Sequence, residues 1–136
     1  YEFDSVKIVH DYGKSMSEGI DLGQVEGALI QGIGWMTMEE IGYNTDGRLL
    51  SNALSTYKVP DIFSIPKSVE VIPVETEGNE MAILKSKAVG EPPLMYGIGA
   101  YFALQNAIKA FNPNYDLKFH SPMTPEKVLM SLYSKN

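Results

Sequence analysis

The chain has 136 residues, of which 44% are hydrophobic and 21% charged, a composition typical of one ordinary globular domain. Its net charge of −6 argues against a nucleic-acid or anionic-membrane binder, because such proteins present a basic face. The chain has no cysteine, which excludes disulfides, thiolate metal ligands and a cysteine nucleophile within it, and no apolar run is long enough for a membrane span. We therefore expect a cytoplasmic protein.

The first predicted element is a β-strand. Residues 5–12 alternate in polarity, so that Val6, Ile8 and His10 share one face of the strand. The segment that follows, residues 13–19, is rich in turn-forming residues and predicts a loop.

A helix interrupted by glycines follows this loop. Asp21 and Gln24 have the spacing of a capping box, so we expect the helix to extend from Gln24 to residue 40. Each glycine inside a helix costs about 1 kcal/mol relative to alanine. Three of them together predict that a neighbouring helix or a ligand comes very close to this backbone; they are Gly27, Gly32 and Gly34.

The middle of the chain predicts extended segments joined by turns. Asp46 and Gly47 form a dipeptide that is typical of a hairpin. Residues 68–75 are rich in β-branched side chains and predict a strand, and Pro73 places that strand at a sheet edge or a bulge. Residues 81–89 predict a further extended run.

Two helices are expected in the last third of the chain. Residues 94–111 carry apolar side chains at helical spacing after a pair of prolines, and residues 126–134 follow a second helix-start signal, Thr124-Pro125. The chain shows neither internal repeats nor a linker. We therefore expect a single α+β domain in which helices pack on a mixed, partly antiparallel sheet.

The segment SKAVGEPPL, residues 86–94, carries the strongest chemical signal. Gly90 permits backbone angles that other residues avoid, and Pro92 disfavours the helical region for Glu91, so we expect Glu91 to be extended. The prolines stiffen the chain and start a helix, whose N-terminal partial positive charge favours an ionised acid. A rigidly held, ionised carboxylate is suited to act as a general base.

Each candidate residue also has a structural explanation. Glu91 suits the start of a helix, where an acid stabilises the helix dipole by up to about 1 kcal/mol. Gln24 either holds a polar ligand through its amide or completes the capping box. Lys87 is either an anion-binding residue or a solvated charge, whereas His10 and His120 have no partner at metal-ligand spacing.

Four short motifs follow one another along the chain: DLGQVEGA at residues 21–28, STYKVP at 55–60, SKAVGEPP at 86–93 and SPMTPE at 121–126. In this order they resemble the C-terminal part of the molybdenum-binding region of the xanthine dehydrogenase family. The resemblance implies that residues 1–136 are the C-terminal segment of a molybdenum-cofactor-binding domain, and hence a fragment of a larger molybdenum-binding subunit. The chain departs from the family in the loop before Asp21, where the family commonly has Asn-Pro.

The resemblance implies a role for each matching residue. Glu91 matches the family's active-site glutamate, the base beside the molybdenum that removes a proton from the attacking hydroxyl group. Gln24 matches the glutamine that hydrogen-bonds the pterin part of the cofactor. Lys87, Ala88 and Gly90 match the segment that delivers the glutamate, and they are expected to contact the cofactor as well.

The same resemblance implies a molybdenum–molybdopterin cofactor. The expected partners are the remainder of the molybdenum subunit and the iron–sulfur and FAD domains or subunits that carry electrons away. The paired prolines and the STYK-like segment resemble the xanthine-oxidising members, which implies hydroxylation of an electron-poor carbon in a purine-type heterocycle. The chain alone is expected to be inactive, because it holds one wall of such a site.

Two other functions stay open at this point. The chain is alternatively a non-catalytic assembly domain, in which the same motifs form junctions that pack on partner domains. A third hypothesis is a small-molecule-binding module unrelated to molybdenum. Turnover of a Glu91→Gln variant separates catalysis from assembly, and metal analysis of the natural complex tests the third hypothesis.

Overall fold

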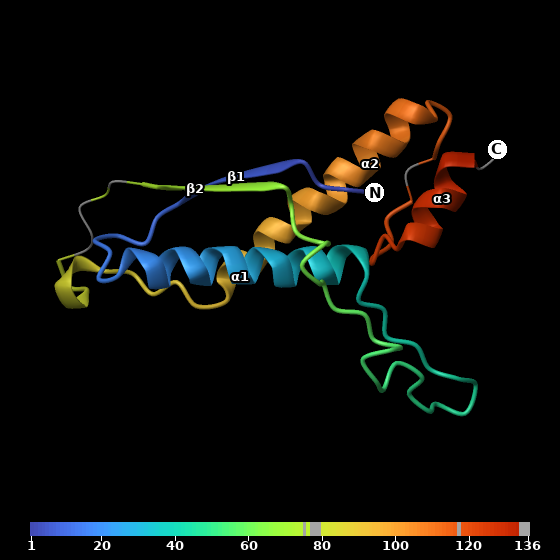
Figure 1. The fold of residues 1–136 in the computed structure, drawn as a ribbon, viewed down its shortest axis with the longest axis horizontal. Helices are drawn as coiled ribbons and strands as arrows, with labels where there is room; N and C mark the ends of the chain where they lie inside the picture. Colours follow the sequence, from blue (N-terminus) through green and yellow to red (C-terminus); the bar gives the residue numbers. More distant parts are fainter. Residues whose placement is uncertain (75, 77–79, 117, 134–136) are drawn as a thin grey trace.

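The computed structural model describes residues 1–74, 76, 80–116 and 118–133. Two strands lie beside a long helix, and a second long helix crosses the first (Figure 1). The elements in chain order are β1 (Ser5–His10), α1 (Glu18–Thr37), β2 (Ser68–Pro73), the 3₁₀ turns η1 (Ile83–Lys85) and η2 (Pro92–Gly97), α2 (Ile98–Phe111) and α3 (Pro125–Tyr133).

The α+β class is confirmed, but the expected mixed, partly antiparallel sheet is wrong. β1 and β2 form a two-stranded parallel sheet, with Ser5 opposite Ser68 and His10 opposite Pro73. A crossover that contains α1 joins the two strands, and a crossover of this kind is what parallel neighbours require. Antiparallel pairing in the described part of the chain is confined to isolated bridges, Gly13 with Ser86 and Tyr43 with Leu49.

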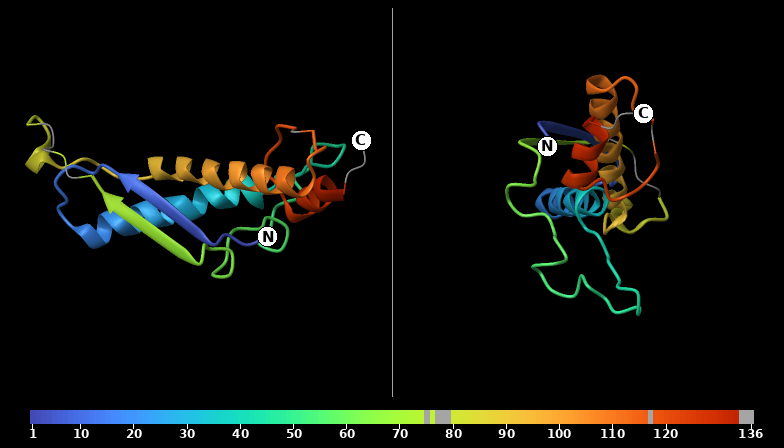
Figure 2. Two further views of the ribbon diagram at one scale, coloured as in Figure 1. Left: turned by 90° about the horizontal axis from the view of Figure 1, so that it is seen from above. Right: turned by 90° about the vertical axis from the view of Figure 1, so that its right-hand side faces the viewer.

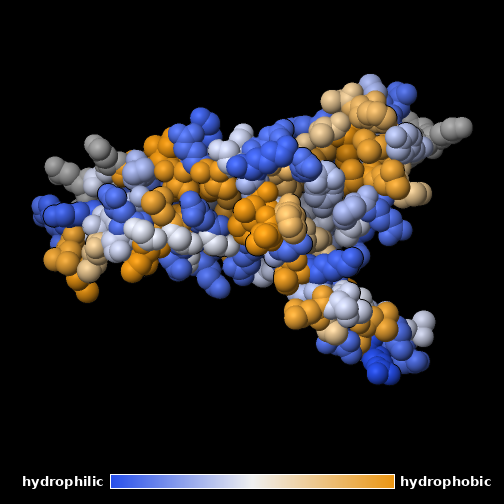
Figure 3. Space-filling view, viewed as in Figure 1, coloured by the Kyte–Doolittle hydropathy of each residue, from blue (hydrophilic) through white to orange (hydrophobic). Residues whose placement is uncertain are grey.

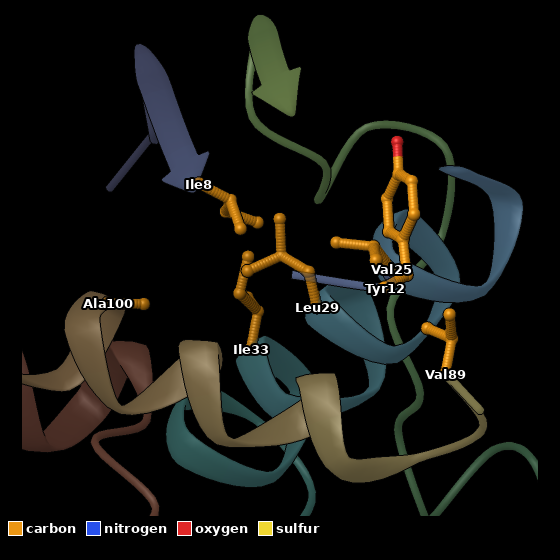
Figure 4. Packing of buried hydrophobic residues seen from close by; sticks show 7 residues of the cluster. All are labelled: Ile8, Tyr12, Val25, Leu29, Ile33, Val89 and Ala100. Atoms are coloured by element: carbon orange, nitrogen blue, oxygen red, sulfur yellow. The ribbon is translucent and has the colours of Figure 1, made fainter. Parts of the chain in front are cut away.

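The main core lies between this sheet and α1. Ile8 is 3% exposed, and its strand neighbours Val6 and His10 on the same face are partly buried, as the alternation predicts. Covering one such aliphatic side chain stabilises the fold by about 1.5–3 kcal/mol. Figure 4 shows how the buried cluster joins the strand, the two helices and the segment before η2; its members are Ile8, Tyr12, Val25, Leu29, Ile33, Val89 and Ala100.

The N-terminus of α1 differs from the sequence-based expectation. The helix begins at Glu18 rather than at Gln24, and the N-cap residue Ser17 makes no side-chain capping bond. Asp21 lies in the first turn, where its carboxylate accepts a hydrogen bond from the Ser15 hydroxyl at 2.6 Å. The predicted capping box therefore does not form, because backbone bonds to the Ser17 carbonyl already start the helix further upstream.

Between α1 and β2 the chain forms an arm, residues 38–67, that projects away from the helices (Figures 1 and 2). The predicted turn is present, with Gly47 at a φ of 78°. Within the arm, the Tyr57 hydroxyl donates a hydrogen bond to Glu39, two residues beyond the end of α1. Apolar side chains lie exposed along the arm, including Leu54 at 84% and Phe63 at 88% (Figure 3).

The C-terminal half also contains elements that the sequence pattern did not predict. Residues 81–89 are not a plain extended run, because η1 interrupts them. A six-residue 3₁₀ turn precedes α2, so that the α-helix begins at Ile98. A second buried cluster joins α2 to α3. No helix among the described residues is long and apolar enough to span a bilayer.

Candidate active site

The backbone around Glu91 makes a sharp turn at the surface. Val89 is 7% exposed and belongs to the main core, whereas Gly90 and Glu91 are exposed. Gly90 has a φ of 53°, in the left-handed region that side-chain-bearing residues avoid, which confirms the reason expected for a glycine here. The turn therefore leads the chain from the core directly to the surface at Glu91.

The expected extended conformation of Glu91 is wrong. Its φ and ψ are −90° and −18°, in the right-handed helical region, and its carbonyl accepts the amide of Leu94 at 2.9 Å. The steric bias of Pro92 is a preference, and the hydrogen bond that closes the first turn of η2 outweighs it. Within the described residues, the Glu91 carboxylate has neither a hydrogen bond nor an ion pair, so its direction depends on this turn.

The turn lies against α1. Val89 shares a cluster with Val25 of α1 (Figure 4), and the Leu94 carbonyl lies directly against Gly32. A Cβ atom at Gly32 would overlap that carbonyl, and one at Gly97 would overlap the backbone of Gly32. The segment that carries Glu91 therefore runs along α1 from the level of Val25 to that of Gly32.

The glycines of α1 divide into two groups. Gly32 contacts η2 and Gly34 contacts Pro60 of the arm, which confirms the predicted close approach at two of the three glycines but not at Gly27. A Cβ built on Gly23 or Gly27 would meet no described atom within 4 Å. The exposed side chain of Gln24 stands beside this bare backbone and has no hydrogen bond within the described chain. This stretch of α1 therefore offers an amide side chain and uncovered backbone to a flat polar ligand.

Lys87 lies three residues before Gly90, and its side chain is paired within the chain. Its ammonium group contacts the Asp11 carboxylate at 2.5 Å, and its amide donates to the Tyr12 carbonyl at 3.0 Å. The Lys87 hydrogen bond, assisted by the Gly13 amide and the Thr76 hydroxyl, lowers the pKa of Asp11 to about 2. Lys87 thus anchors the segment to the end of β1, and a cofactor contact from Lys87 or from the exposed Ala88 stays a prediction.

Lys87→Met is expected to raise the pKa of Asp11 from about 2 toward its ordinary value of 3.8, because the largest cause of the shift is removed. A pKa lowered by folding adds stability that is present above the ordinary pKa and lost as the pH falls toward 2. The variant should therefore lose less stability than the parent over this acidic range. NMR titration of the Asp11 carboxyl carbon measures the shift. Lys85→Met is the control, and an unmoved Asp11 pKa in Lys87→Met would contradict the assignment.

The structure also reveals a polar contact that the sequence pattern did not indicate. The Tyr96 hydroxyl lies 2.7 Å from Nδ1 of His10, and both side chains are partly buried. In the sequence His10 has no partner at metal-ligand spacing, and its contact with Tyr96 is a structural one. No spacing rule links the end of a strand to a turn 86 residues later. The one available signal is that Tyr96 carries the single polar side chain of PPLMYG, the sequence of η2.

Comparison with known proteins agrees with the motifs. Residues 1–66 match the profile of a family described as the molybdopterin cofactor-binding domain. The xanthine dehydrogenase/oxidase of Felis catus is 44% identical over 128 residues, which cover 89% of this chain and 10% of that protein. The chain belongs to the xanthine dehydrogenase family. The molybdenum–molybdopterin cofactor expected from the motifs agrees with this family.

Membership of the xanthine dehydrogenase family leaves the substrate open. A protein of Oryza sativa subsp. japonica named probable aldehyde oxidase 2 is 39% identical over 117 residues, covering 86% of this chain and 9% of that protein. The fold matches quinoline 2-oxidoreductase from Pseudomonas putida 86 with a TM-score of 0.82 at 23% identity, over 98% of this chain and 16% of that one. The chain spans about a tenth of the length of the Felis catus and Oryza sativa relatives.

Proposed function

We propose that this chain forms one wall of the molybdenum-cofactor site in a xanthine dehydrogenase-like hydroxylase, with Glu91 as the general base. The proposed substrate carries an electron-poor carbon in a purine-type heterocycle. The observation that carries the proposal is the glycine-started turn that presents an otherwise unbound carboxylate beside α1. Residues 1–136 would be the C-terminal segment of the cofactor-binding domain.

The residues present fit a flat, polar cofactor. Gly23 and Gly27 leave the backbone of α1 uncovered, because side chains at these positions would meet no described atom. Gln24 lies between them with an exposed amide that can both donate and accept hydrogen bonds. When bound, the molybdenum cofactor would supply the redox chemistry, whereas the protein supplies position and proton transfer.

Glu91 would act by accepting a proton. Both carboxylate oxygens are available, because no described side chain donates a hydrogen bond to them, and the turn places them at the surface rather than within the core. A general base has to reach the proton that it removes, within about 2.6–3.2 Å between heavy atoms. The remaining walls, and the iron–sulfur and FAD groups that carry electrons away, would come from the rest of the protein, so this chain alone should be inactive.

Gln24→Ala in the complete enzyme is expected to weaken retention of the cofactor by about 3- to 10-fold, the effect of losing one ordinary hydrogen bond. Molybdenum content after dialysis measures this retention. Gln31→Ala is the matched control, because it removes the same side chain two turns further along α1. Equal molybdenum loss in both variants would contradict the assignment of Gln24.

The exposed arm favours a second candidate, a non-catalytic packing domain. Its uncovered apolar side chains are what a surface that docks on other domains presents. Glu91→Gln in the complete enzyme separates the two candidates, because it removes the base while nearly preserving side-chain shape. Lost turnover with intact folding and metal content supports catalysis, whereas unchanged turnover supports the packing function.

A further inference from the structure

A hydrogen bond joins the end of the parallel sheet to the turn that begins at Glu91. His10 is the last residue of β1, and Tyr96 is the fifth residue of η2. The Tyr96 hydroxyl lies 2.7 Å from Nδ1 of His10, and the two rings meet edge to face, with centroids 5.8 Å apart at 83°. A bond of this length and ring geometry restricts both side chains.

Glu91 depends on η2 for its direction. Its own carboxylate has no hydrogen bond or ion pair in the part of the chain that the structure describes, so nothing beyond the backbone orients it. The Glu91 carbonyl is itself part of the first turn of η2, through the bond from the Leu94 amide. A rotation of η2 would therefore move the carboxylate with it.

Two contacts resist such a rotation, one to α1 and one to the sheet. The backbone of Gly97 lies against that of Gly32, which holds η2 close to α1. This contact of backbone against backbone fixes the separation of the two segments. The bond from Tyr96 to His10 adds a directional contact to the sheet, and hydrogen bonds weaken steeply when their angle changes.

We propose that Tyr96 and His10 are positioning residues, which fix the orientation of η2 and through it the direction of the Glu91 carboxylate. The inference rests on the proposed function of Glu91 as the base. Misplacement of a reacting group by about 1 Å costs up to about 100-fold in rate. Partial loosening, through the loss of one hydrogen bond, should cost about 3- to 10-fold in kcat.

The test uses the complete enzyme and four variants. Tyr96→Phe and His10→Leu each remove the bond, and each is expected to lower kcat by about 3- to 10-fold with KM within about twofold. The double variant should be no slower than either single variant, because both lose the same bond. His10→Asn places an amide group near the position of Nδ1 and should restore most of kcat.

A second readout does not depend on turnover. Amide hydrogen exchange at residues 94–97 should accelerate in Tyr96→Phe and His10→Leu and return toward the parent rate in His10→Asn. Tyr57→Phe is the matched control, because it removes a tyrosine hydroxyl bond to Glu39 in the arm, and it should leave kcat and this exchange unchanged.

The outcomes separate this inference from the proposed function. Unchanged kcat and exchange in Tyr96→Phe, in an enzyme that Glu91→Gln inactivates, would overturn the positioning role alone. Strictly additive losses in the double variant would overturn it too. Unchanged turnover in Glu91→Gln would refute the proposed base and, with it, the role of Tyr96 in positioning that base.

Discussion

Glu91→Gln is expected to lower kcat of the complete enzyme by about 100- to 10,000-fold, the usual contribution of a general base. The amide has almost the shape of the carboxylate but cannot accept a proton at neutral pH. Because Glu91 is exposed and has no partner within the described chain, the substitution breaks no internal contact and should leave folding unchanged. Steady-state kinetics measure the loss, and molybdenum analysis checks the metal content.

Two companion variants make the Glu91 result specific. Glu91→Asp keeps the acid but withdraws it by one methylene, so it should retain more turnover than Glu91→Gln. Glu26→Gln removes an exposed carboxylate from α1 and should leave kcat unchanged, since Glu26 has no part in the proposed proton transfer. Similar activity in the parent enzyme and in Glu91→Gln would show that the carboxylate is not the base.

Gly97→Ala is expected to produce the second large effect. Its methyl group would overlap the backbone of Gly32, and neither backbone can move without displacing η2 or α1. Overpacking of this kind lowers the stability of the packed segments by about 1–3 kcal/mol. Where local opening controls amide exchange, this loss makes exchange in α1 and η2 roughly 5- to 150-fold faster. Turnover should fall as well, because η2 carries Glu91.

Gly99→Ala is the matched control for Gly97→Ala. It lies two residues further along, at the start of α2, where an added Cβ would meet no described atom within 4 Å. Alanine has the higher helix propensity, so Gly99→Ala should be neutral or stabilise the helix by up to about 1 kcal/mol. Gly32→Ala should reproduce the Gly97→Ala effect from the opposite side. Equal exchange rates in Gly97→Ala and Gly99→Ala would show that the Gly32–Gly97 contact does not hold η2.

Local features of the fold were predictable because they depend on neighbouring residues. The alternation in β1 identifies Ile8 as inward, and only glycine readily takes the left-handed conformation found at position 90. The parallel pairing was not predictable, because an alternating strand looks the same with either kind of neighbour. The start of α1 was misplaced for a related reason: a capping box at Asp21 is a local pattern, and the helix began at Glu18 without it.

The candidate site was predictable in its residues more than in its geometry. The motif around Glu91 identified the turn. The rule that proline disfavours the helical region for the preceding residue gave the wrong backbone conformation for Glu91, because the hydrogen bond from the Leu94 amide holds Glu91 in that region. Lys87 proved to be paired with Asp11, a residue 76 positions earlier. Tyr96 was missed because its partner His10 lies 86 positions earlier, and such contacts follow from the fold rather than from spacing.

The parallel register has a consequence for synthesis on the ribosome. Each residue of β2 pairs with one 63 positions earlier, as Ser68 does with Ser5. At about 5–20 residues per second, translation leaves β1 without its strand neighbour for on the order of 3–13 s. During that interval the hydrogen-bonding edge of the nascent strand is open to other chains, so a slow codon stretch between α1 and β2 would prolong the period of greatest risk of misassembly.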